Sequence, residues 1–319
     1  MLSDSLFSLD ANAAQGIAHS TALSESDQNL IEVSSWFRAQ SDLKTRFGNL
    51  IRQSIDEVLD GQRTGRFNLK DLEKTEKTYL GTKVEIVARA EFGLGRGAKM
   101  DFLIDGHEVD AKFTSGDNWT IPSEADGHIC LLIKANDHRA FFQVGLIKIS
   151  DAYLNLGKNR DGKRSLSAAG RNAIEWLVKE GELPENILLN LPDSAMKSIF
   201  ENKRSGQART NELFLRVQEK LINRNTVLTV ARQDDSPKRV RDARSHLRNR
   251  GVIILGHQGQ HPRIARDLGL PVPTKGSWVS ARITELENPS TSRGSTEISG
   301  RIYAVWKDGD PSSVAPDKY

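Results

Sequence analysis

The chain has 319 residues, of which 27% are charged and 37% hydrophobic, and its formal net charge is +3. This length is sufficient for two domains of ordinary size, at about 150 residues each. No stretch approaches the roughly 20 continuous apolar residues of a membrane span, and the first twenty residues lack the basic-then-apolar order of a secretory signal. The sequence therefore predicts a soluble, intracellular protein without a membrane partner.

Charge is distributed unevenly along the chain. Residues 187–319 contain 22 lysines and arginines against 14 acidic residues, a balance of +8, and residues 1–186 contain 23 against 28, a balance of −5. A basic half of this kind is expected to bind a polyanion. Cys130 is the only cysteine, which excludes an intrachain disulfide, and its apolar neighbours predict a buried structural thiol.

The N-terminal region is predicted to contain a flexible tail followed by helices. Residues 1–24 are rich in Ser, Ala and Asn without sustained periodicity, which is typical of a loosely held terminus. Between residues 26 and 59, apolar residues at helical spacing predict two helices that face a core. A further helix is predicted for residues 79–92, and three glycines within residues 93–97 end it.

A β-hairpin is predicted next. Asp105-Gly106 separates two short alternating runs, and this dipeptide is typical of a two-residue type I′ turn, in which both residues take positive φ. The predicted strands are residues 101–104 and 107–113. In this register Asp101 faces Asp110 with Cβ atoms roughly 5 Å apart, and two carboxylates so placed repel unless a cation lies between them.

The second strand of the hairpin combines an acid and a base. Because side chains alternate along a strand, Asp110 and Lys112 share one face, and Val109, Ala111 and Phe113 are expected to point into the core. Two carboxylates and an amine are thus predicted to converge. Oxygen ligands suit Mg²⁺, and the lysine would orient or deprotonate the attacking water and offset charge on a phosphorus. The alternative is a surface hairpin with its Asp and Lys in solvent.

Polar residues outside the hairpin are further candidates. Glu85, on the predicted helix before the hairpin, would bring a third carboxylate toward the metal, although a solvent-facing glutamate is the commoner case. Asn118 and Trp119 lie in a loop after the hairpin, and loops beside a site often provide specificity. Arg63 and Arg66, in a glycine-containing break, would hold phosphates or belong to a solvated loop.

More strands and a domain boundary follow. Residues 128–134 and 140–149 predict two buried strands, so the sheet should have at least four. Residues 167–179 predict a helix. The chain then divides into a tail, a first domain, a linker and a second domain, with predicted bounds 1–24, 25–178, 179–186 and 187–319.

The second domain opens with helical patterns. These cover residues 194–202 and 208–222, and residues 226–231 fit either a strand or a short helix. Ser236, followed by Pro237, predicts the N-cap of a helix that ends near residue 250.

That last helix is strongly basic. Arg241, Arg244 and Arg248 recur at i, i+3 and i+7 and form one face, with Lys238, Arg239 and Arg250 nearby. Such a helix is suited to a groove of DNA. The alternative is a solvated basic helix without a partner.

The rest of the second domain predicts a small sheet. A short helix is expected at residues 261–268, and strands at 251–256, 277–284 and 299–306. Helices followed by a β-wing predict a winged-helix, or helix-turn-helix, fold. His257 and His261 are four residues apart, as in a metal pair, but no third ligand accompanies them.

Distinctive segments of the chain are DGQRTGR at 60–66, KTEKT at 74–78, VEI at 84–86, VDAKF at 109–113, GHICL at 127–131, GQAR at 206–209, VIILGHQ at 252–258 and DLGLPVP at 267–273. In these segments, and over nearly everything after residue 50, the chain resembles the NaeI-type restriction endonucleases. The resemblance implies an α/β (α+β) chain. Its N-terminal endonuclease domain would have a mixed sheet flanked by helices, and its C-terminal domain a catabolite-activator-like helix-turn-helix.

The same resemblance implies a site of the PD-(D/E)xK class. Its catalytic residues would be Glu85, Asp101, Asp110 and Lys112, with Glu85, Asp101 and Asp110 as the Mg²⁺ ligands. One departure is Met100, which stands where the broad pattern has proline. The residues expected to bind DNA are Arg63, Arg66, Asn118, Trp119, Lys238, Arg239, Arg241, Arg244 and Arg248.

The implied function is that of a Type IIE site-specific deoxyribonuclease in the prokaryotic cytoplasm. Such an enzyme is a homodimer that makes Mg²⁺-dependent double-strand breaks at a short palindrome and is stimulated by a second bound DNA site. Two alternatives stay open. One is a strand-passage or nicking-closing enzyme, which needs a nucleophile such as Tyr79 or Tyr153, and the other is a DNA-binding regulator that does not cut.

Overall fold

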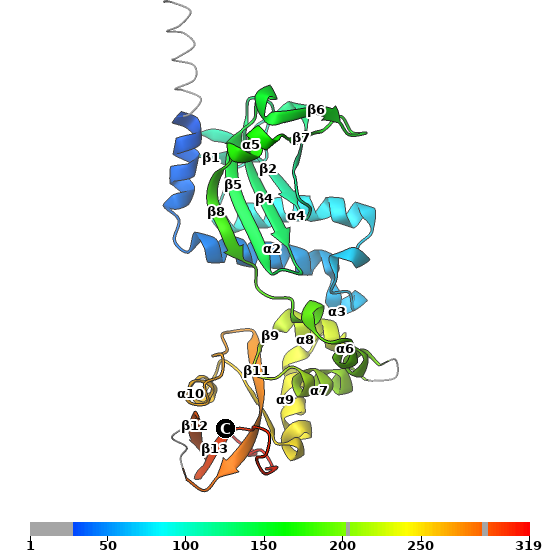
Figure 1. The fold of residues 1–319 in the computed structure, drawn as a ribbon, viewed down its shortest axis with the longest axis vertical. Coiled ribbons are helices and arrows are strands. Elements are labelled where there is room, and N and C mark those ends of the chain that lie inside the picture. Colours follow the sequence, from blue (N-terminus) through cyan, green and yellow to red (C-terminus); the bar gives the residue numbers. More distant parts are fainter. Residues whose placement is uncertain (1–27, 202–204, 289–292) are drawn as a thin grey trace, which may run out of the picture. The chain divides into compact units, whose positions relative to one another are not determined.

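The fold is described from a computed structural model, which covers residues 28–201, 205–288 and 293–319 (Figure 1). The predicted flexible tail, residues 1–24, lies outside these residues. The chain forms two compact units. Unit 1 contains the described residues up to Val58 together with Glu73–Glu185, and unit 2 contains Leu59–Leu72 and Asn186–Tyr319. No helix of the described segments is long and apolar enough to cross a membrane.

Unit 1 is built on a mixed five-stranded sheet in the order β1-β2-β4-β5-β8. Strands β2 and β4 are parallel and the other neighbouring pairs are antiparallel. The predicted sheet of at least four strands is therefore confirmed. The bounds are Phe102–Ile104 for β1, His107–Thr114 for β2, Ile129–Asn136 for β4, Phe141–Lys148 for β5 and Glu175–Glu182 for β8.

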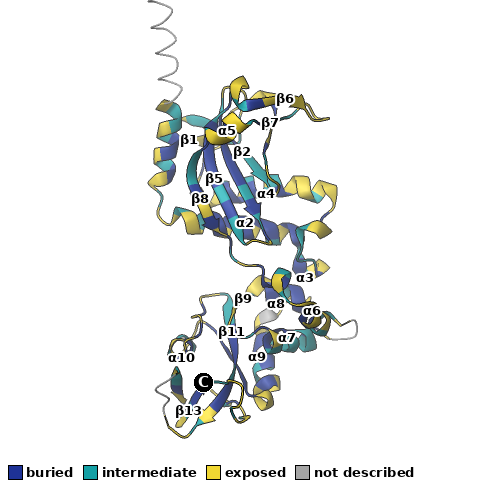
Figure 2. Cartoon of the chain, in the orientation of Figure 1, coloured by how far each residue is buried: buried dark blue, intermediate teal, exposed yellow. Residues whose placement is uncertain are grey.

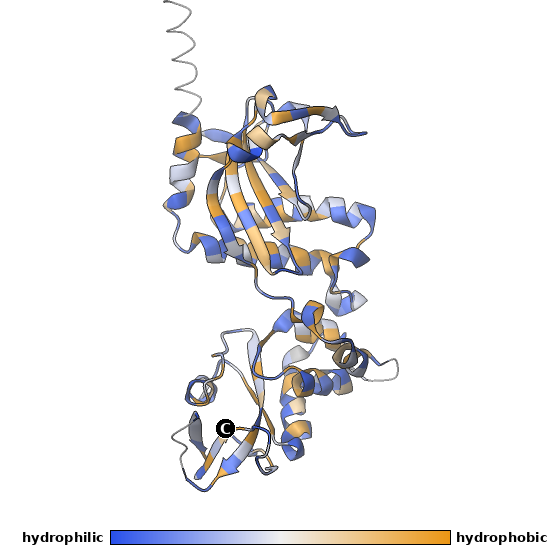
Figure 3. Cartoon of the chain, in the orientation of Figure 1, coloured by the Kyte–Doolittle hydropathy of each residue, from blue (hydrophilic) through white to orange (hydrophobic). Residues whose placement is uncertain are grey.

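The centre of this sheet is its most apolar part. Most residues of β4 and β5 are buried, and Figures 2 and 3 show these two strands as largely buried and hydrophobic. A strand that lies between two others in a covered sheet has a nearly continuous run of apolar residues. Such runs were the basis on which both strands were predicted. Cys130 in β4 is fully buried, as expected for a structural thiol.

Helices pack on the sheet of unit 1. Residues 28–38 are helical, and α2 (Leu43–Leu59) and α4 (Lys74–Phe92) follow, as the helical spacing predicted. Glu73 and Glu76 form a capping box at the start of α4, and Gly93 ends it in the left-handed conformation. Leu80, Val84, Val87 and Ala88 are buried on its inner face, and α4 packs against β2.

The predicted helix at residues 167–179 is wrong. Only a short helix, α5 (Ala168–Asn172), forms there, and the chain then continues as β8, which pairs with the free edge of β5. Gly181 in β8 leaves room for the ring of Phe142, which a Cβ atom would clash with. The first half of the predicted linker 179–186 is thus a strand, because pairing with β5 outweighs the local helical pattern.

Three short strands that the sequence did not predict form a second sheet in unit 1. Their order is β3-β7-β6, with bounds Thr120–Ile121, Arg164–Leu166 and Leu154–Lys158. Trp119, Ile121 and Leu166 contribute to the core beneath them.

Unit 2 combines short helices with a set of antiparallel strands. The helices are α3 (Gly61–Thr64), α6 (Asp193–Phe200), α7 (Gly206–Arg216), α8 (Arg224–Ala231), α9 (Ser236–Leu247) and α10 (His261–Asp267). A sheet in the order β10-β11-β13-β12 has the bounds Val252–Leu255, Ser277–Leu286, Arg301–Val305 and Ser295–Ile298, and β9 (Leu221–Asn223) also pairs with β11. The helix predicted for 208–222 therefore ends at Arg216, and residues 226–231 are helical.

The segment Leu59–Leu72 belongs to unit 2, which a single boundary near residue 180 did not anticipate. Gly61 lies so close to Thr229 of α8 that a Cβ atom would not fit. Phe67 stacks on Phe200 with ring centroids 5.8 Å apart, and its carbonyl accepts a hydrogen bond from Asn186 Nδ2. These contacts join residues more than a hundred positions apart, so no local pattern indicates them.

Candidate active site

The β1–β2 hairpin forms in the predicted register. Phe102 pairs with Val109 and Ile104 with His107, and the turn residues Asp105 and Gly106 have φ values of 50° and 83°. Fewer side chains on the inner face of β2 are fully buried than predicted. Val109 is fully buried, whereas Ala111 and Phe113 are only partly so.

The two aspartates of the hairpin lie together. Asp101, just before β1, accepts a hydrogen bond from the backbone N–H of Ala111 at 2.8 Å. This contact holds the Asp101 carboxylate beside the strand that carries Asp110. Lys112 Nζ lies 2.6 Å from Asp110 Oδ2 and 2.7 Å from Oδ1, so the predicted group of two acids and one amine is present.

Two negative charges on Asp101 and Asp110 are unfavourable in this partly buried position. Burial raises the pKa of Asp110 to about 6, and the neighbouring Asp101 carboxyl adds to the rise while Lys112 opposes it. Burial and the charge of Asp101 also raise the pKa of Glu85, against the opposing effects of Arg89 and Lys112. Asp101 and Lys112 are thus close enough to affect the pKa values of both Asp110 and Glu85.

Arg89 connects α4 to the hairpin and was missed by the sequence analysis. Its guanidinium lies 2.5 Å from Glu85 Oε1, donates to the backbone carbonyl of Asp101 at 3.1 Å, and sits 5.6 Å from the ring centre of Phe102. It therefore ties the orientation of Glu85 to the start of β1. The i, i+4 spacing from Glu85 was the available signal.

The carboxylates of this site are oxygen ligands of the kind that a divalent cation prefers. Among the described residues, no group of three or more His, Cys, Asp or Glu is arranged to hold a metal ion. Glu85 is paired with Arg89 and Asp110 with Lys112. The carboxylates of Asp101 and Asp110 fit a cation, because a cation between them would offset both the burial and the repulsion that raise the Asp110 pKa. The predicted role of Glu85 as a third ligand stays a prediction.

Cys130 borders this site without being a reactive thiol. Its Sγ lies 3.7 Å from Asp110 Oδ2. Burial, followed by the charge of Asp110, raises the Cys130 pKa well above its usual value. The thiol therefore stays protonated and packs beneath the aspartate.

Two residues predicted to bind DNA in unit 1 have internal roles. Trp119 is 3% exposed and donates through Nε1 to the carbonyl of Ile133 at 3.0 Å, so its burial contradicts a direct DNA contact. Asn118 donates to the carbonyl of Leu166 and accepts from the N–H of Trp119, which fixes the start of β3.

The predicted phosphate-binding arginines of residues 60–66 lie in unit 2. Arg63 is exposed on α3 and pairs with Asp60 at 3.1 Å. Arg66 donates through Nε to the carbonyl of Leu59 at 3.3 Å. They therefore belong to unit 2 and not to the unit that contains the hairpin, and their contact with phosphates stays a prediction.

The basic helix forms as α9, with Val240, Ala243 and Leu247 buried as predicted. Its N-cap is Asp235, one residue before the predicted Ser236. The helix stops at Leu247, and Arg248–Arg250 form a 3-10 turn.

The arginines of α9 differ in what they contact. Arg244 Nε donates to the carbonyl of Ile254 at 2.8 Å, and Arg248 Nε to that of Ala315 at 3.0 Å. Arg239 pairs with Asp235 at 2.9 Å, and Lys238 lies 3.4 Å from Asp242. Arg241 is exposed and makes no such contact with the described residues. Several side chains of the predicted basic face are thus engaged in hydrogen bonds or ion pairs within the protein.

His261 has a structural role. The N–H of Gly256 donates to its Nδ1 at 3.0 Å, and its Nε2 lies 3.0 Å from the carbonyl oxygen of Tyr319. Both ring nitrogens are engaged, which disfavours a metal pair with His257.

A mixed sheet with helices packed on it, and two aspartates and a lysine on an edge hairpin, defines the class of restriction-endonuclease-like proteins. The sequence profile of the family described as restriction endonuclease NaeI matches residues 32–314. The type II restriction enzyme NaeI of Lentzea aerocolonigenes is 44% identical over 302 residues, which cover 92% of this chain and 95% of that protein. The chain therefore belongs to the NaeI restriction endonuclease family, and its enzyme class is that of a type II site-specific deoxyribonuclease, as the resemblance implied.

Proposed function

We propose that the protein makes Mg²⁺-dependent double-strand breaks at a short palindromic DNA sequence. The observation that carries the proposal is the convergence of Asp101, Asp110 and Lys112 on the β1–β2 hairpin. A homodimer would place two such sites on the two strands of a palindrome, because a two-fold axis in the protein matches the two-fold axis of the DNA. Cleavage would take place in the cytoplasm.

In the proposed mechanism each residue has a defined task. Asp101 and Asp110 would hold Mg²⁺, which would neutralise phosphate charge and lower the pKa of the attacking water. Lys112 Nζ, held by Asp110, would donate a hydrogen bond to the attacking water or to the phosphate oxygen on which charge develops. Glu85, whose pKa is raised and whose position Arg89 fixes, would accept a proton from water. In-line attack leaves a 5′-phosphate and a 3′-hydroxyl.

The test is digestion of a plasmid library by the purified enzyme, followed by sequencing of the ends. We expect linear products with one recurrent palindrome in Mg²⁺, and none in EDTA. Relaxed circles without linear product would indicate a strand-passage enzyme instead. Tight DNA binding without any cutting, even with added duplex that carries the palindrome, would indicate a regulator.

Unit 2 is proposed to bind a second copy of the site as effector, through a winged-helix surface centred on α9. Support comes from the charge balance of +8 in residues 187–319 and from the exposed Arg241. Stimulation of cleavage by a separate oligonucleotide duplex that carries the palindrome is the expected sign of this second site.

Arg241→Ala is expected to weaken effector binding. Loss of one phosphate contact should reduce the slope of log K against log salt by about 0.9. Arg244→Ala should act differently, because its loss removes a hydrogen bond to Ile254 and costs about 1 kcal/mol of folding stability. Fluorescence anisotropy over a salt series and thermal unfolding measure the two effects. Arg266→Ala, an exposed arginine on α10, is the matched control, and an unchanged slope for Arg241→Ala would refute the assignment.

A further inference from the structure

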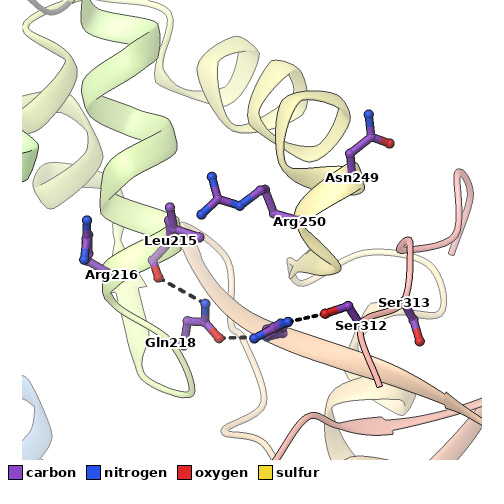
Figure 4. A pocket seen from close by; sticks show the side chains of 8 residues that line it. Leu215, Arg216, Gln218, Asn249, Arg250, Ser312 and Ser313 are labelled. Carbon is purple, nitrogen blue, oxygen red and sulfur yellow. Dashed lines mark hydrogen bonds between the residues drawn. The ribbon is translucent and has the colours of Figure 1, made fainter. Parts of the chain in front are cut away.

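Unit 2 contains a pocket that the proposed catalytic mechanism does not use (Figure 4). Its volume is about 430 Å³, within the range of small-molecule sites. The lining comes from the end of α7, the turn after α9, strand β11 and the C-terminal segment, and consists of Leu215, Arg216, Gln218, Asn249, Arg250, Arg282, Ser312 and Ser313.

The pocket is lined by three arginines and by no carboxylate, and the acid that pairs with Arg216, Glu212, is not part of the lining. Three guanidinium groups at one concave surface repel each other, and the repulsion is relieved when an anion lies between them. This is the opposite charge pattern to the aspartate pair of unit 1, where a cation is expected. The surrounding hydroxyl and amide groups are neutral, so the lining as a whole favours a negative ligand.

Two of the arginines are held in place. The Arg282 guanidinium stacks 4.0 Å from the ring centre of Trp306 and donates to Ser312 Oγ at 2.9 Å, as the dashed line in Figure 4 shows. The Arg282 backbone N–H donates to Gln218 Oε1 at 2.8 Å. Arg216 is restrained by an ion pair with Glu212 at 3.3 Å. Prepositioned guanidinium groups lose less conformational entropy when a ligand binds.

The third arginine is free to bind. Arg250 is exposed, and its side chain makes no hydrogen bond or ion pair with the described residues. Figure 4 shows it reaching from the turn after α9 toward Leu215 and Arg216. A guanidinium group is a planar set of N–H donors, which matches the oxygens of a phosphate group.

We propose that the Arg216–Arg250–Arg282 pocket binds a phosphate group. The volume exceeds what a single phosphate needs, so the group can be part of a larger ligand. Its source is either a backbone phosphodiester of DNA held by unit 2, which rests on the proposed function, or a free phosphate or nucleotide. Either source uses the same guanidinium donors.

The first experiment uses inorganic phosphate and the full chain. Isothermal titration at low ionic strength is expected to show saturable binding by the unmodified protein and at least tenfold weaker binding by Arg250→Gln. Arg250 is chosen because its side chain makes no contact that supports the fold, and thermal unfolding of the variant checks this. Arg266→Gln, an exposed arginine outside the pocket, is the charge-matched control and should bind phosphate as the unmodified protein does.

The second experiment separates the two sources. If Arg250→Gln also binds effector duplex more weakly, with a salt slope reduced by about 0.9, the ligand is a DNA backbone phosphate. If phosphate binding is lost while duplex binding is unchanged, the ligand is a free phosphate or nucleotide. The proposal is overturned if the unmodified protein shows no saturable phosphate binding or if Arg250→Gln binds phosphate equally well. Because neither assay measures cleavage, failure of the proposed nuclease function would not affect this result.

Discussion

Asp110→Asn is expected to lower the rate of DNA cleavage by about a thousandfold or more. The substitution removes one of two carboxylates proposed to hold Mg²⁺, and a loss of about 4 kcal/mol of transition-state stabilisation corresponds to that factor. Asparagine has the same shape, so the hairpin should be unaffected. Single-turnover cleavage of a duplex that carries the palindrome measures the effect, and a rate equal to that of the unmodified enzyme would refute the proposed role.

The same substitution should stabilise the metal-free protein at alkaline pH. Folding raises the Asp110 pKa from 3.8 to about 6, so the folded state prefers the neutral form. Its favourable contribution to stability is fully present below the unfolded pKa of 3.8, declines as pH rises, and is lost above about 6. Asparagine is neutral throughout, so in EDTA at pH 8 the variant should be more stable by about 2 kcal/mol, after allowance for solvent screening.

Thermal unfolding in EDTA at pH 4 and pH 8 distinguishes these contributions. The variant should unfold at a higher temperature than the unmodified protein at pH 8, with little difference at pH 4. A variant that loses cleavage without this pH-dependent gain would show that Asp110 is not destabilised by burial beside Asp101. Lost activity together with gained stability in the variant would indicate that the Asp110 charge serves catalysis at a cost to folding stability.

Lys112→Met is expected to reduce cleavage by about 10²- to 10⁴-fold while DNA binding is retained. The amine lies 2.6 Å from Asp110 Oδ2 and is proposed to stabilise charge that develops only during the reaction, so its loss affects the rate more than the binding. Single-turnover rates in Mg²⁺ and binding measured in Ca²⁺ separate the two.

Lys134→Met is the matched control for this prediction. Lys134 lies on the neighbouring strand β4, opposite Thr114 of β2, and its amine is 3.4 Å from the exposed Asp117. Its replacement should leave cleavage within about twofold of the unmodified rate, as expected for a surface ion pair. Equal losses for both variants would show that the effect of Lys112 is one of general charge rather than of position.

The sequence by itself determined the elements that depend on near neighbours. The Asp105-Gly106 turn fixes the register of the hairpin, because only a few residues around it decide which side chains face each other, and that register brought Asp101 and Asp110 together as predicted. The inward face of α9 followed in the same way from its 3.6-residue period. The apolar runs of β4 and β5 also sufficed to identify buried strands.

Features that depend on contacts between residues far apart in the sequence were decided only by the tertiary structure. Residues 175–179 were predicted as the end of a helix but form β8 together with residues 180–182, because the open edge of β5 offers them a ladder of hydrogen bonds. Leu59–Leu72 joins unit 2 through contacts with residues more than a hundred positions away, and Trp119 is buried by strands that were not predicted. Arg89 and the arginine pocket likewise depend on side chains that meet only after folding. The physical reason is that turn geometry and periodicity are local properties, whereas burial and pairing depend on which surfaces the rest of the chain makes available.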